Sequence, residues 1–495
     1  MMYGEEKSDS LIVAANLANN PQGAESVERR SGAKGNAEQP HMRRTQSRES
    51  MSQRLSRVRE AAKQRKKERF TALFHLLTAE ALENAFLSLS RKAAAGVDGV
   101  RWKDYAENLK VNIADLHRRL HQGSYRAQPG RRHYIPKADG KQRPLGIASL
   151  EDKIVQYALV KILNAVYEND FMGFSYGFRP GRSQHNALDA LATGLVRTNV
   201  NWVLDADISQ FFDKVSHEWL IRFIEHRIGD QRVIRLIRKW LTAGTSEEGE
   251  WRASEEGTPQ GAVISPLLAN IYLHYVFDLW AHQWRRRHAT GNVVMVRYAD
   301  DIVIGFDKRI DAQCFRIAMQ RRLKEFGLTV HPKKTRLMEF GRFAAENRAS
   351  RGKDKPETFN FLGFTHISGK DRSGRFMLIR KTRRDRMTAT LKAIKDGLRK
   401  RWHYSIPEQG KWLRRVVQGY LNYHSVPGNY PMMRKFRIYV TDLWRRALRR
   451  RSQQDDTTWT KANRLAAVWL PKVRVLHPWP VERFTARHPR QEPGA

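Results

Sequence analysis

Cysteine is nearly absent from this sequence, which holds Cys314 and no other among its 495 residues. One cysteine cannot close an internal disulfide, and it cannot supply the cysteine cluster of a structural zinc site. Phe315, Met319 and Leu323 follow it at helical spacing. We therefore expect Cys314 to be an ordinary packing residue of a helix.

Long apolar runs are missing as well, and the sequence shows no signal peptide and no lipidation signal. A chain of this composition has no evident means of crossing or anchoring to a bilayer. We therefore expect a cytoplasmic protein that has no membrane partner.

Acidic residues are too few to balance the basic ones. The chain has 51 Asp and Glu against 90 Lys and Arg, which gives a formal net charge of +39. Such an excess repels itself unless a polyanion neutralises it, so nucleic acid is the expected partner. A basic protein that lies on a membrane surface is the alternative, and the missing anchor disfavours it.

The first 69 residues are rich in polar and basic residues and poor in aromatic ones. We expect residues 1–69 to be a disordered basic extension. Residues 54–69 have the composition of a basic helix, so a helix along an RNA backbone and a solvated linker are both compatible with them. Ordered domains should begin near Phe70, and the chain is long enough for two or more.

Carboxylates interrupt two apolar stretches of the chain. Residues 293–306 predict two β-strands joined by a tight turn that carries Asp300 and Asp301. An upstream strand carries Asp205 and Asp207 on one side, because side chains alternate along a strand. A solvated turn would explain the hairpin alone. Together the two strands favour carboxylates that converge on a pair of Mg²⁺ ions, the arrangement suited to nucleotidyl transfer.

These carboxylates belong to a longer series of motifs. Tyr298-Ala299-Asp300-Asp301 resembles the YADD box of reverse transcriptases, and the strand with Asp207 resembles their first palm motif. Five further blocks resemble, in order, those of bacterial group II intron-encoded proteins: Ile-Pro-Lys at 135–137, Gln-Arg-Pro-Leu-Gly-Ile at 142–147, Tyr-Gly-Phe-Arg-Pro-Gly-Arg-Ser at 176–183, Gly-Thr-Pro-Gln-Gly at 257–261 and Phe-Leu-Gly-Phe at 361–364. The chain is identified as a reverse transcriptase and maturase of this family. We expect the form without the C-terminal endonuclease domain, because no His and Cys pattern of that domain follows Trp469.

The resemblance implies a catalytic set at the two acidic strands. Asp207, Asp300 and Asp301 would be the catalytic residues and would hold two Mg²⁺ ions, with the backbone carbonyl of Ile208 as a further metal ligand. Asp205 stays a candidate beside them.

The resemblance also assigns residues to the incoming dNTP, namely Lys137, Arg143, Phe212, Gln260 and Lys334. Lys137 and Arg143 flank an expected hairpin turn, and their charges suit the β and γ phosphates. The ring of Phe212 would lie under C2′ and exclude a ribose hydroxyl, Gln260 would contact the nucleotide, and Lys334 would lie near the departing pyrophosphate. Core packing of Phe212, a loop-capping amide at Gln260 and a surface position for Lys334 are the alternatives.

Template and primer are assigned to Arg179, Arg182, Tyr298, Leu362 and Gly363. Arg179 and Arg182 lie in a segment whose glycines and proline disfavour regular structure and whose aromatic residues offer stacking faces. Packing of those aromatic residues into the protein is equally compatible. Leu362 and Gly363 form the turn of a strand-turn unit that resembles the primer grip.

The sequence therefore predicts an α+β right-hand polymerase. Fingers and a palm with an antiparallel sheet are expected over residues 70–372, and an all-α basic thumb or maturase domain over 373–455. The Pro- and Trp-rich basic tail, residues 456–495, is a candidate DNA-binding appendage.

The activity that the resemblance implies is RNA-directed DNA synthesis for a mobile group II intron in the bacterial cytoplasm. The protein would also bind the intron RNA and assist its splicing, which supports retrohoming. Its partners would be intron RNA, target DNA, primer and dNTPs, and its oligomeric state stays open. An RNA-binding maturase with a vestigial polymerase is one alternative. A reverse transcriptase of a retron, diversity-generating or defence system is another.

Overall fold

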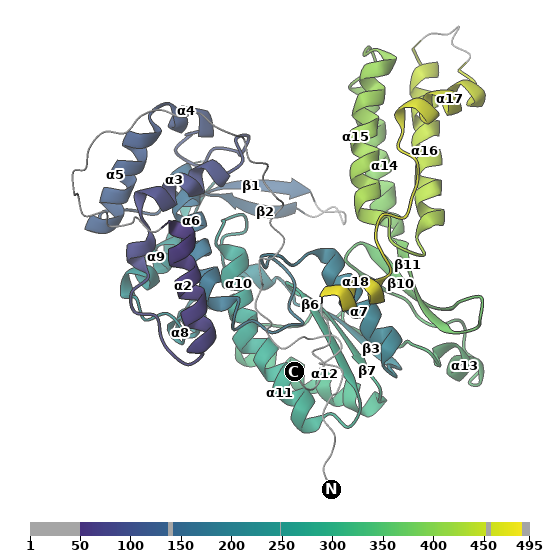
Figure 1. Ribbon diagram of the computed structural model, residues 1–495, viewed down its shortest axis with the longest axis horizontal. Helices are drawn as coiled ribbons and strands as arrows, with labels where there is room; N and C mark the ends of the chain where they lie inside the picture. The colour runs from purple at the N-terminus through teal and green to yellow at the C-terminus, as the bar shows by residue number, and fades with distance from the viewer. Residues whose placement is uncertain (1–49, 137–141, 248, 452–456, 488–495) are drawn as a thin grey trace, which may run out of the picture.

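The computed structural model describes residues 50–136, 142–247, 249–451 and 457–487. Three sheets and many helices make up an α+β fold, as the sequence predicts. One group of long helices stands apart from the rest of the molecule (Figure 1). We call α14, α15, α16 and α17 the helical unit.

Helices surround a small sheet in the first part of the chain. The helices are α2 (Met51–Gln64), η1 (Phe74–Leu76), α3 (Ala79–Ser88), α4 (Trp102–Glu107), α5 (Leu109–Gln122), α6 (Leu150–Tyr167), α8 (His217–Glu225) and α9 (Gln231–Thr242). Thr78 caps α3 by accepting a hydrogen bond from the backbone N–H of Ala81, as its position before an apolar run predicts. The sheet has the order β2-β1-β4-β5, with β1 (Gly130–Pro136), β2 (Gln142–Ile147), β4 (Thr245–Glu247) and β5 (Glu250–Arg252). Strands β1 and β2 are antiparallel, and the turn between them lies outside the described residues.

A second sheet carries the predicted acidic strands. Its order is β6-β7-β3-β8 and all its pairs are antiparallel, with β3 (Trp202–Asp207), β6 (Val293–Tyr298), β7 (Asp301–Phe306) and β8 (Arg336–Glu339). The helical elements of this part are α7 (Gln184–Arg197), η2 (Phe211–Asp213), α10 (Ser265–Leu273), η3 (His274–Asp278), α11 (Leu279–His288), α12 (Arg309–Glu325) and α13 (Ala344–Ala349). Helix α7 packs against β6 and β7, and α12 packs against β3 and β7. The near-continuous apolar runs of β6 and β7 follow from this burial.

A third sheet leads into the helical unit. Its order is β11-β10-β9, with β9 (Phe359–Phe361), β10 (Phe364–Lys370) and β11 (Phe376–Thr382). The helices that follow are α14 (Arg384–Arg399), α15 (Ile406–His424), α16 (Tyr430–Arg449) and α17 (Trp459–Trp469). Pro407 and Pro431 stand in the first turns of α15 and α16, where the missing N–H costs nothing.

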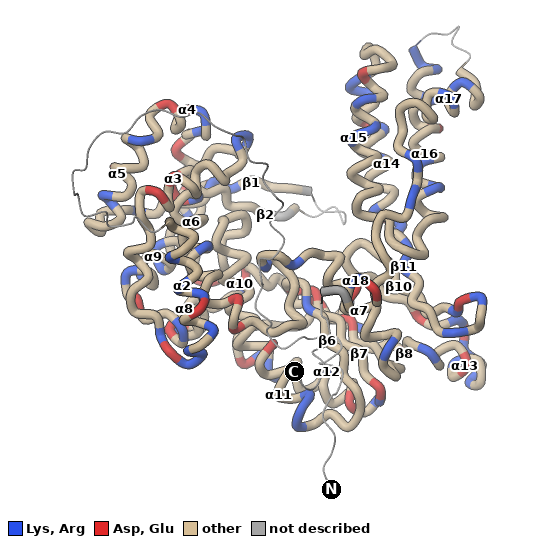
Figure 2. Tube along the Cα trace, viewed as in Figure 1, with Lys and Arg blue, Asp and Glu red and all other residues tan. Residues whose placement is uncertain are grey.

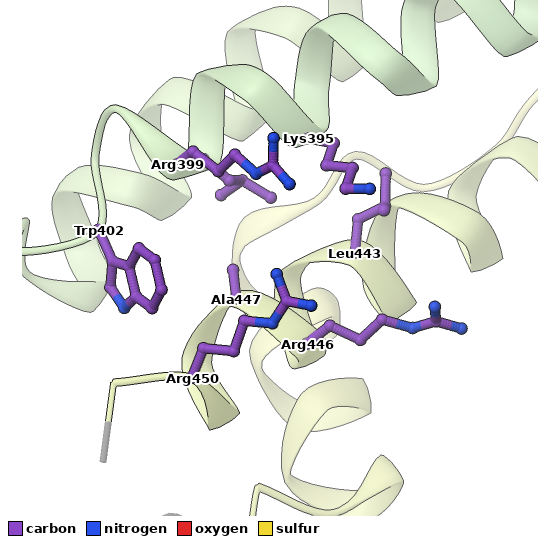
Figure 3. A pocket seen from close by; sticks show the side chains of 8 residues that line it. Lys395, Arg399, Trp402, Leu443, Arg446, Ala447 and Arg450 are labelled. Atoms are coloured by element: carbon purple, nitrogen blue, oxygen red, sulfur yellow. The ribbon is translucent and has the colours of Figure 1, made fainter.

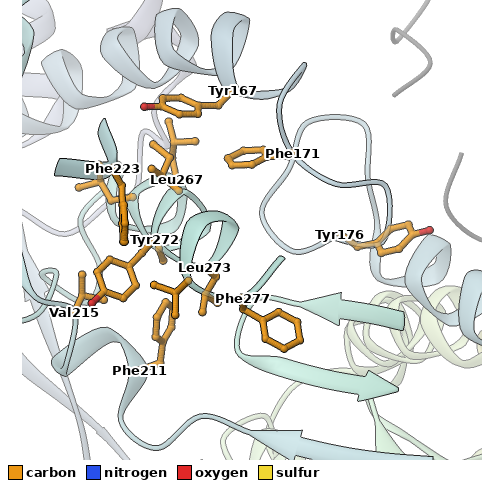
Figure 4. Packing of buried hydrophobic residues seen from close by; sticks show 14 of the residues in the cluster. Tyr167, Phe171, Tyr176, Phe211, Val215, Phe223, Leu267, Tyr272, Leu273 and Phe277 are labelled. Atoms are coloured by element: carbon orange, nitrogen blue, oxygen red, sulfur yellow. The ribbon is translucent and has the colours of Figure 1, made fainter. Parts of the chain in front are cut away.

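The buried apolar residues form two separate cores. The larger core contains residues of the second and third sheets and of the helices around the first two sheets, and its aromatic centre includes Phe211, Tyr272 and Phe277 (Figure 4). The smaller core lies between the helices of the helical unit and includes Phe436 and Trp444. Separate cores are the usual sign of separate folding units.

The C-terminal segment connects these two units. From α17 the chain runs back along the helical unit to α18 (Pro480–Arg487), which lies against α7 (Figure 1). Phe484 of α18 joins the larger core, and Arg483 forms an ion pair with the buried Asp189 of α7. The described part of the tail, residues 457–487, thus connects the helical unit to α7 and the larger core.

Two expectations are corrected here. Residues 1–69 were expected to be a disordered extension, with a helix left open over 54–69, and residues 51–64 form α2, which packs against α6 through the buried Ala62 and the partly buried Leu55 and Val58. Cys314 was expected to pack inside, but it is exposed on α12, while Phe315, Met319 and Leu323 are buried. The expected domain boundary at 372/373 falls between β10 and β11, and the helical unit begins at Arg384.

Lys and Arg occur throughout the described chain and recur along α14, α15 and α16 (Figure 2). Within the described ranges, no helix is both long enough and apolar enough to span a bilayer.

Candidate active site

The carboxylates of the two acidic strands come together at one end of the second sheet. Asp207, the last residue of β3, is paired directly with Asp301, the first residue of β7. Directly paired residues in antiparallel strands have Cβ atoms about 4.5–5.5 Å apart. Asp300 precedes Asp301 in the turn, and Asp205 lies two residues before Asp207, on the same side of β3. The convergence predicted from the sequence is therefore present.

A two-residue turn carries the carboxylates out of the sheet. Ala299 and Asp300 connect β6 to β7, and Ala299 has a positive φ of 56°, which is uncommon for a residue with a side chain. The backbone of Gly177 lies directly against this turn. A Cβ at Gly177 would stand 2.4 Å from the backbone nitrogen of Ala299, so only glycine fits.

The carboxylates repel one another. Protein packed around its carboxyl group raises the pKa of Asp301 to about 7, although the residue still reaches solvent, and the charges of Asp300, Asp207 and Asp205 contribute. Burial raises the pKa of Asp205 to about 6, where Asp207 adds to the shift and Arg336 opposes it. A site that holds this much negative charge is suited to bind cations.

Lys334 supplies one such cation. Its ammonium group donates to Oδ2 of Asp207 at 2.8 Å, and this hydrogen bond raises the pKa of Lys334. The lysine is brought there because the chain before it pairs with the end of β3: Val330 bridges Ile208, and the N–H of His331 donates to the carbonyl of Asp207. The structure therefore places Lys334 at the carboxylates, and its contact with the departing pyrophosphate stays a prediction.

The fit of these residues to a metal follows from their donor chemistry. Within the described residues, no group of three or more His, Cys, Asp or Glu side chains is arranged so that it could hold a metal ion as it stands. The oxygens that could bind a metal are those of the Asp207, Asp300 and Asp301 carboxylates and the backbone carbonyl of Ile208. Within the described part of the chain, the Ile208 carbonyl accepts no hydrogen bond. All these oxygens are hard donors, which suit Mg²⁺.

Residues assigned to the dNTP lie next to the carboxylates. Phe212 follows β3 in η2 and is half-buried, whereas Phe211 is in the core. The loop at 257–261 packs on η2, since the N–H of Thr258 donates to the carbonyl of Phe212 at 2.7 Å. In that loop the Gln260 amide donates to Asp213 at 2.7 Å.

The first sheet reaches the same place. The N–H of Gly146 in β2 donates to the Gln260 carbonyl at 2.6 Å, which joins β2 to the loop at 257–261. Arg143 lies on β2, paired with Ile135 of β1. Lys137 lies outside the described residues.

The assignment of Arg179 and Arg182 to the template is corrected. Arg179 is 5% exposed, forms an ion pair with Glu168 and donates to the carbonyls of Met172 and Ser175. Arg182 donates to the carbonyls of Gly173 and Ser175. The N–H of Ser175 also donates to the carbonyl of Met172, and the two arginine side chains supply donors for the loop carbonyls of Gly173 and Ser175.

Phe178 and the partly buried Tyr298 form an aromatic pair beside the turn that carries Asp300. Phe174 of the irregular segment is buried, but Phe178 is 52% exposed and has a positive φ of 58°. Its ring lies 6.3 Å from that of Tyr298. The sequence alone did not choose between packing and exposure for Phe178, and the structure places it where a base could stack.

Leu362 and Gly363 form the tight turn between β9 and β10, with φ values of 44° and 80°. Positive φ at both positions is the mark of a type I′ hairpin turn. The Tyr423 hydroxyl of α15 donates to the carbonyl of Leu362 at 2.8 Å. The expected strand-turn unit is present, and α15 of the helical unit holds it.

A buried polar network under the catalytic turn was not anticipated from the sequence. Arg297, the residue before Tyr298, is fully buried and forms an ion pair with Asp278. Its guanidinium group also donates to Asn270, to the Ser175 hydroxyl and to the carbonyl of Ala299, so all five N–H groups are used.

This network ties three segments to the turn. Asn270 of α10 also donates from its amide to the carbonyl of Gly177 at 2.7 Å, and the backbone of the Gly177 segment bonds to that of Arg297. Asp278 ends η3, a single π-helical turn between α10 and α11. Such turns are frequent at functional sites. The sequence signal was an arginine inside an otherwise apolar strand.

Comparison with known proteins agrees with this geometry. Residues 135–366 match the family described as reverse transcriptase (RNA-dependent DNA polymerase). The chain is similar to protein YkfC of Escherichia coli (strain K12), with 43% identity over 206 residues that make up 41% of this chain and 54% of that protein. It is also similar to group II intron-encoded protein LtrA of Lactococcus lactis subsp. cremoris, with 37% identity over 223 residues, 44% of this chain and 37% of LtrA.

A third relative is nuclear intron maturase 2, mitochondrial, of Arabidopsis thaliana. The identity is 29% over 110 residues, 21% of this chain and 15% of that protein. The chain spans at most 54% of the length of these three relatives.

Proposed function

We propose that this chain is a reverse transcriptase of the kind encoded by group II introns and that it copies RNA into DNA at the carboxylates of β3 and β7. The observation that carries the proposal is the direct pairing of Asp207 with Asp301, with Asp300 in the adjoining turn. In this proposal the second sheet is the palm, the first sheet and its helices are the fingers, and the helical unit is the thumb.

Two Mg²⁺ ions are proposed as cofactors, held by Asp207, Asp300, Asp301 and the carbonyl of Ile208. The mutual repulsion of the carboxylates and their hard oxygen donors support this choice. Bound metal supplies positive charge that favours ionisation of the primer 3′-hydroxyl and stabilises the departing pyrophosphate.

The side chains of the chain position the reactants. The ammonium group of Lys334 is exposed and is paired with Asp207, so it can turn toward the departing pyrophosphate. The loop at 257–261 is held on η2, so Gln260 and Phe212 form one wall for the nucleotide. Lys137 and Arg143 are proposed for its phosphates, and Tyr298, Leu362 and Gly363 for the template and primer.

Replacing Phe212 by alanine is expected to relax the choice of sugar. The half-buried ring would no longer fill the space under C2′, so the ratio of rNTP to dNTP incorporation should rise roughly tenfold or more. Single-nucleotide primer extension with dTTP and UTP measures this ratio.

Phe211→Ala is the matched control. Because Phe211 lies in the core, this variant should lose about 3–5 kcal/mol of folding free energy and keep the sugar preference. Equal dTTP to UTP ratios in wild type and Phe212→Ala would remove Phe212 from the nucleotide site.

We also propose that the protein binds its intron RNA and assists splicing, which supports mobility of the intron. The basic residues along α14, α15 and α16 support an RNA-binding role for the helical unit (Figure 2). The name of the Arabidopsis relative, an intron maturase, supports the second activity. Assistance of this kind uses binding energy alone and needs no further reactive group.

Primer extension tests the polymerase proposal. With poly(rA)/oligo(dT), dTTP and Mg²⁺, the full chain should extend the primer, and EDTA should stop it. A folded protein that fails to extend the primer yet binds intron RNA would leave a maturase with a vestigial polymerase site. A splicing assay on the neighbouring intron RNA tests the second activity separately.

A further inference from the structure

A small cavity lies in the helical unit, between the ends of α14 and α16 (Figure 3). Its volume is about 100 Å³. Leu443 and Ala447 of α16 form an apolar wall, and the indole of Trp402 forms another side. Its basic lining residues are Lys395, Arg399, Arg450 and Arg446, of which Arg446 forms an ion pair with Asp442.

Trp402 differs from the other tryptophans of the helical unit. Trp412, Trp459 and Trp469 each lie under an arginine, with guanidinium-to-ring distances of 4.5, 4.9 and 5.7 Å. Trp444 is buried and donates to Gln409 at 2.9 Å. Trp402 stands outside the core of the unit, and its ring has no aromatic or cationic stacking partner within the described ranges.

The cations around the cavity are only partly neutralised. Arg399 lies 3.7 Å from Asp396, an exposed pair of little strength. Lys395 and Arg450 form no ion pair with a carboxylate in the described part of the chain. Cations at the last turn of a helix also stabilise its dipole, but that role needs neither a cavity nor an indole facing it.

We infer that this cavity binds one unpaired nucleotide of a single-stranded nucleic acid. A base would stack on Trp402 against the apolar wall, and its flanking phosphates would contact Lys395, Arg399 and Arg450. Base stacking on an aromatic ring combined with basic residues for the backbone is the general mode of single-strand binding. A simple inorganic anion would use the cations but not the indole or the apolar wall.

The location separates this site from the polymerase site. Helix α14 begins at Arg384, directly after β11, and Lys395 and Arg399 at the cavity lie 11 and 15 residues further along it, about 16 and 22 Å from its start. The nucleotide bound here is therefore not the one being added to the primer. The inference rests on the cavity itself and goes beyond the proposed polymerase and splicing functions. It adds a contact that holds a single-stranded nucleic acid away from the carboxylates.

Binding of a fluorescently labelled uridine heptamer to the full chain tests the inference by anisotropy, and no polymerisation is needed. Trp402→Ala should weaken binding about tenfold, whereas Trp402→Phe should retain most of it, because one stacked base contributes about 1–3 kcal/mol. Arg450→Ala should weaken binding and lower the slope of log K against log salt by about 1. A heptamer with 5-iodouracil should cross-link to the peptide that contains Trp402.

The controls separate this site from the general positive charge. Arg434→Ala removes the same charge from the exposed face of α16 near its other end and should leave the cross-link at Trp402 unchanged. A thymidine heptamer tests whether DNA is bound equally well. If the two substitutions weaken binding of the uridine heptamer only, the pocket is specific for RNA. If Trp402→Ala lowers the melting temperature of the protein, the heptamer affinity of Arg450→Ala is used to test the inference instead. Unchanged heptamer affinity in Trp402→Ala and Arg450→Ala, or a cross-link elsewhere, overturns the inference.

Discussion

Replacing Asp301 by asparagine is expected to abolish DNA synthesis and leave the protein folded. The amide keeps the shape of the side chain but removes a charge that faces Asp207 across the strand pair. Loss of one of the proposed metal ligands should cost several kcal/mol of transition-state stabilisation, which is roughly a thousandfold or more in the rate of primer extension. The carboxylates repel one another, so the melting temperature without Mg²⁺ should not fall.

Asp205→Asn is the matched control for this result. Asp205 is on the same side of β3 but faces Val303 and Arg336 rather than the turn. We expect a loss of roughly tenfold or less, since the change acts only through the field at Asp207. If Asp205→Asn were as inactive as Asp301→Asn, the choice of Asp207 as the main ligand on β3 would be wrong.

Replacing Arg297 by alanine is expected to damage both folding and synthesis. The arginine and Asp278 are fully buried, and removal of one partner leaves the other charge without compensation. Such losses cost about 3–5 kcal/mol in folding free energy, which urea unfolding measures. The Ala299 carbonyl also loses its donor, so the turn with Asp300 should be less well positioned.

A double variant separates the two effects. Arg297→Met with Asp278→Leu replaces the buried pair by apolar side chains, and such exchanges are often neutral for stability. Part of the lost stability should return while kcat stays roughly tenfold or more below wild type and KM changes little, because the link from Arg297 to Ala299 is still absent. Full recovery of kcat with stability would show that Arg297 supports the fold alone.

Local sequence patterns predicted the catalytic strands well. Apolar runs, alternation and a tight turn were enough to place β3, β6 and β7, while the choice of Asp207 over Asp205 as the residue beside the turn came from the family resemblance. The N-cap at Thr78 and the β1–β2 hairpin followed from capping and turn chemistry in the same way. These features depend on neighbours that are close in the sequence.

Features that depend on distant partners could not be predicted. The sequence assigned Arg179 and Arg182 to nucleic acid. Nothing in it shows that the loop carbonyls of Gly173 and Ser175 need hydrogen-bond donors, which these two side chains supply. In the sequence, Arg297 is a charged residue inside an apolar strand with no visible partner. Its partner Asp278 reaches it only because of the π-helical turn between α10 and α11. The core position of Phe484 depends on α7, almost three hundred residues earlier.

The contact between α18 and α7 can form only late in translation, after most of the chain has been synthesised. Helix α7 leaves the ribosome early, yet the apolar side chain that covers it and the arginine that pairs with Asp189 are made near the end. Long separations of this kind slow folding, because a large loop must close before the contact forms. Until residue 484 emerges, this face of the larger core is open to solvent. A nascent chain stalled before that point should therefore be the stage at which chaperones bind it most strongly.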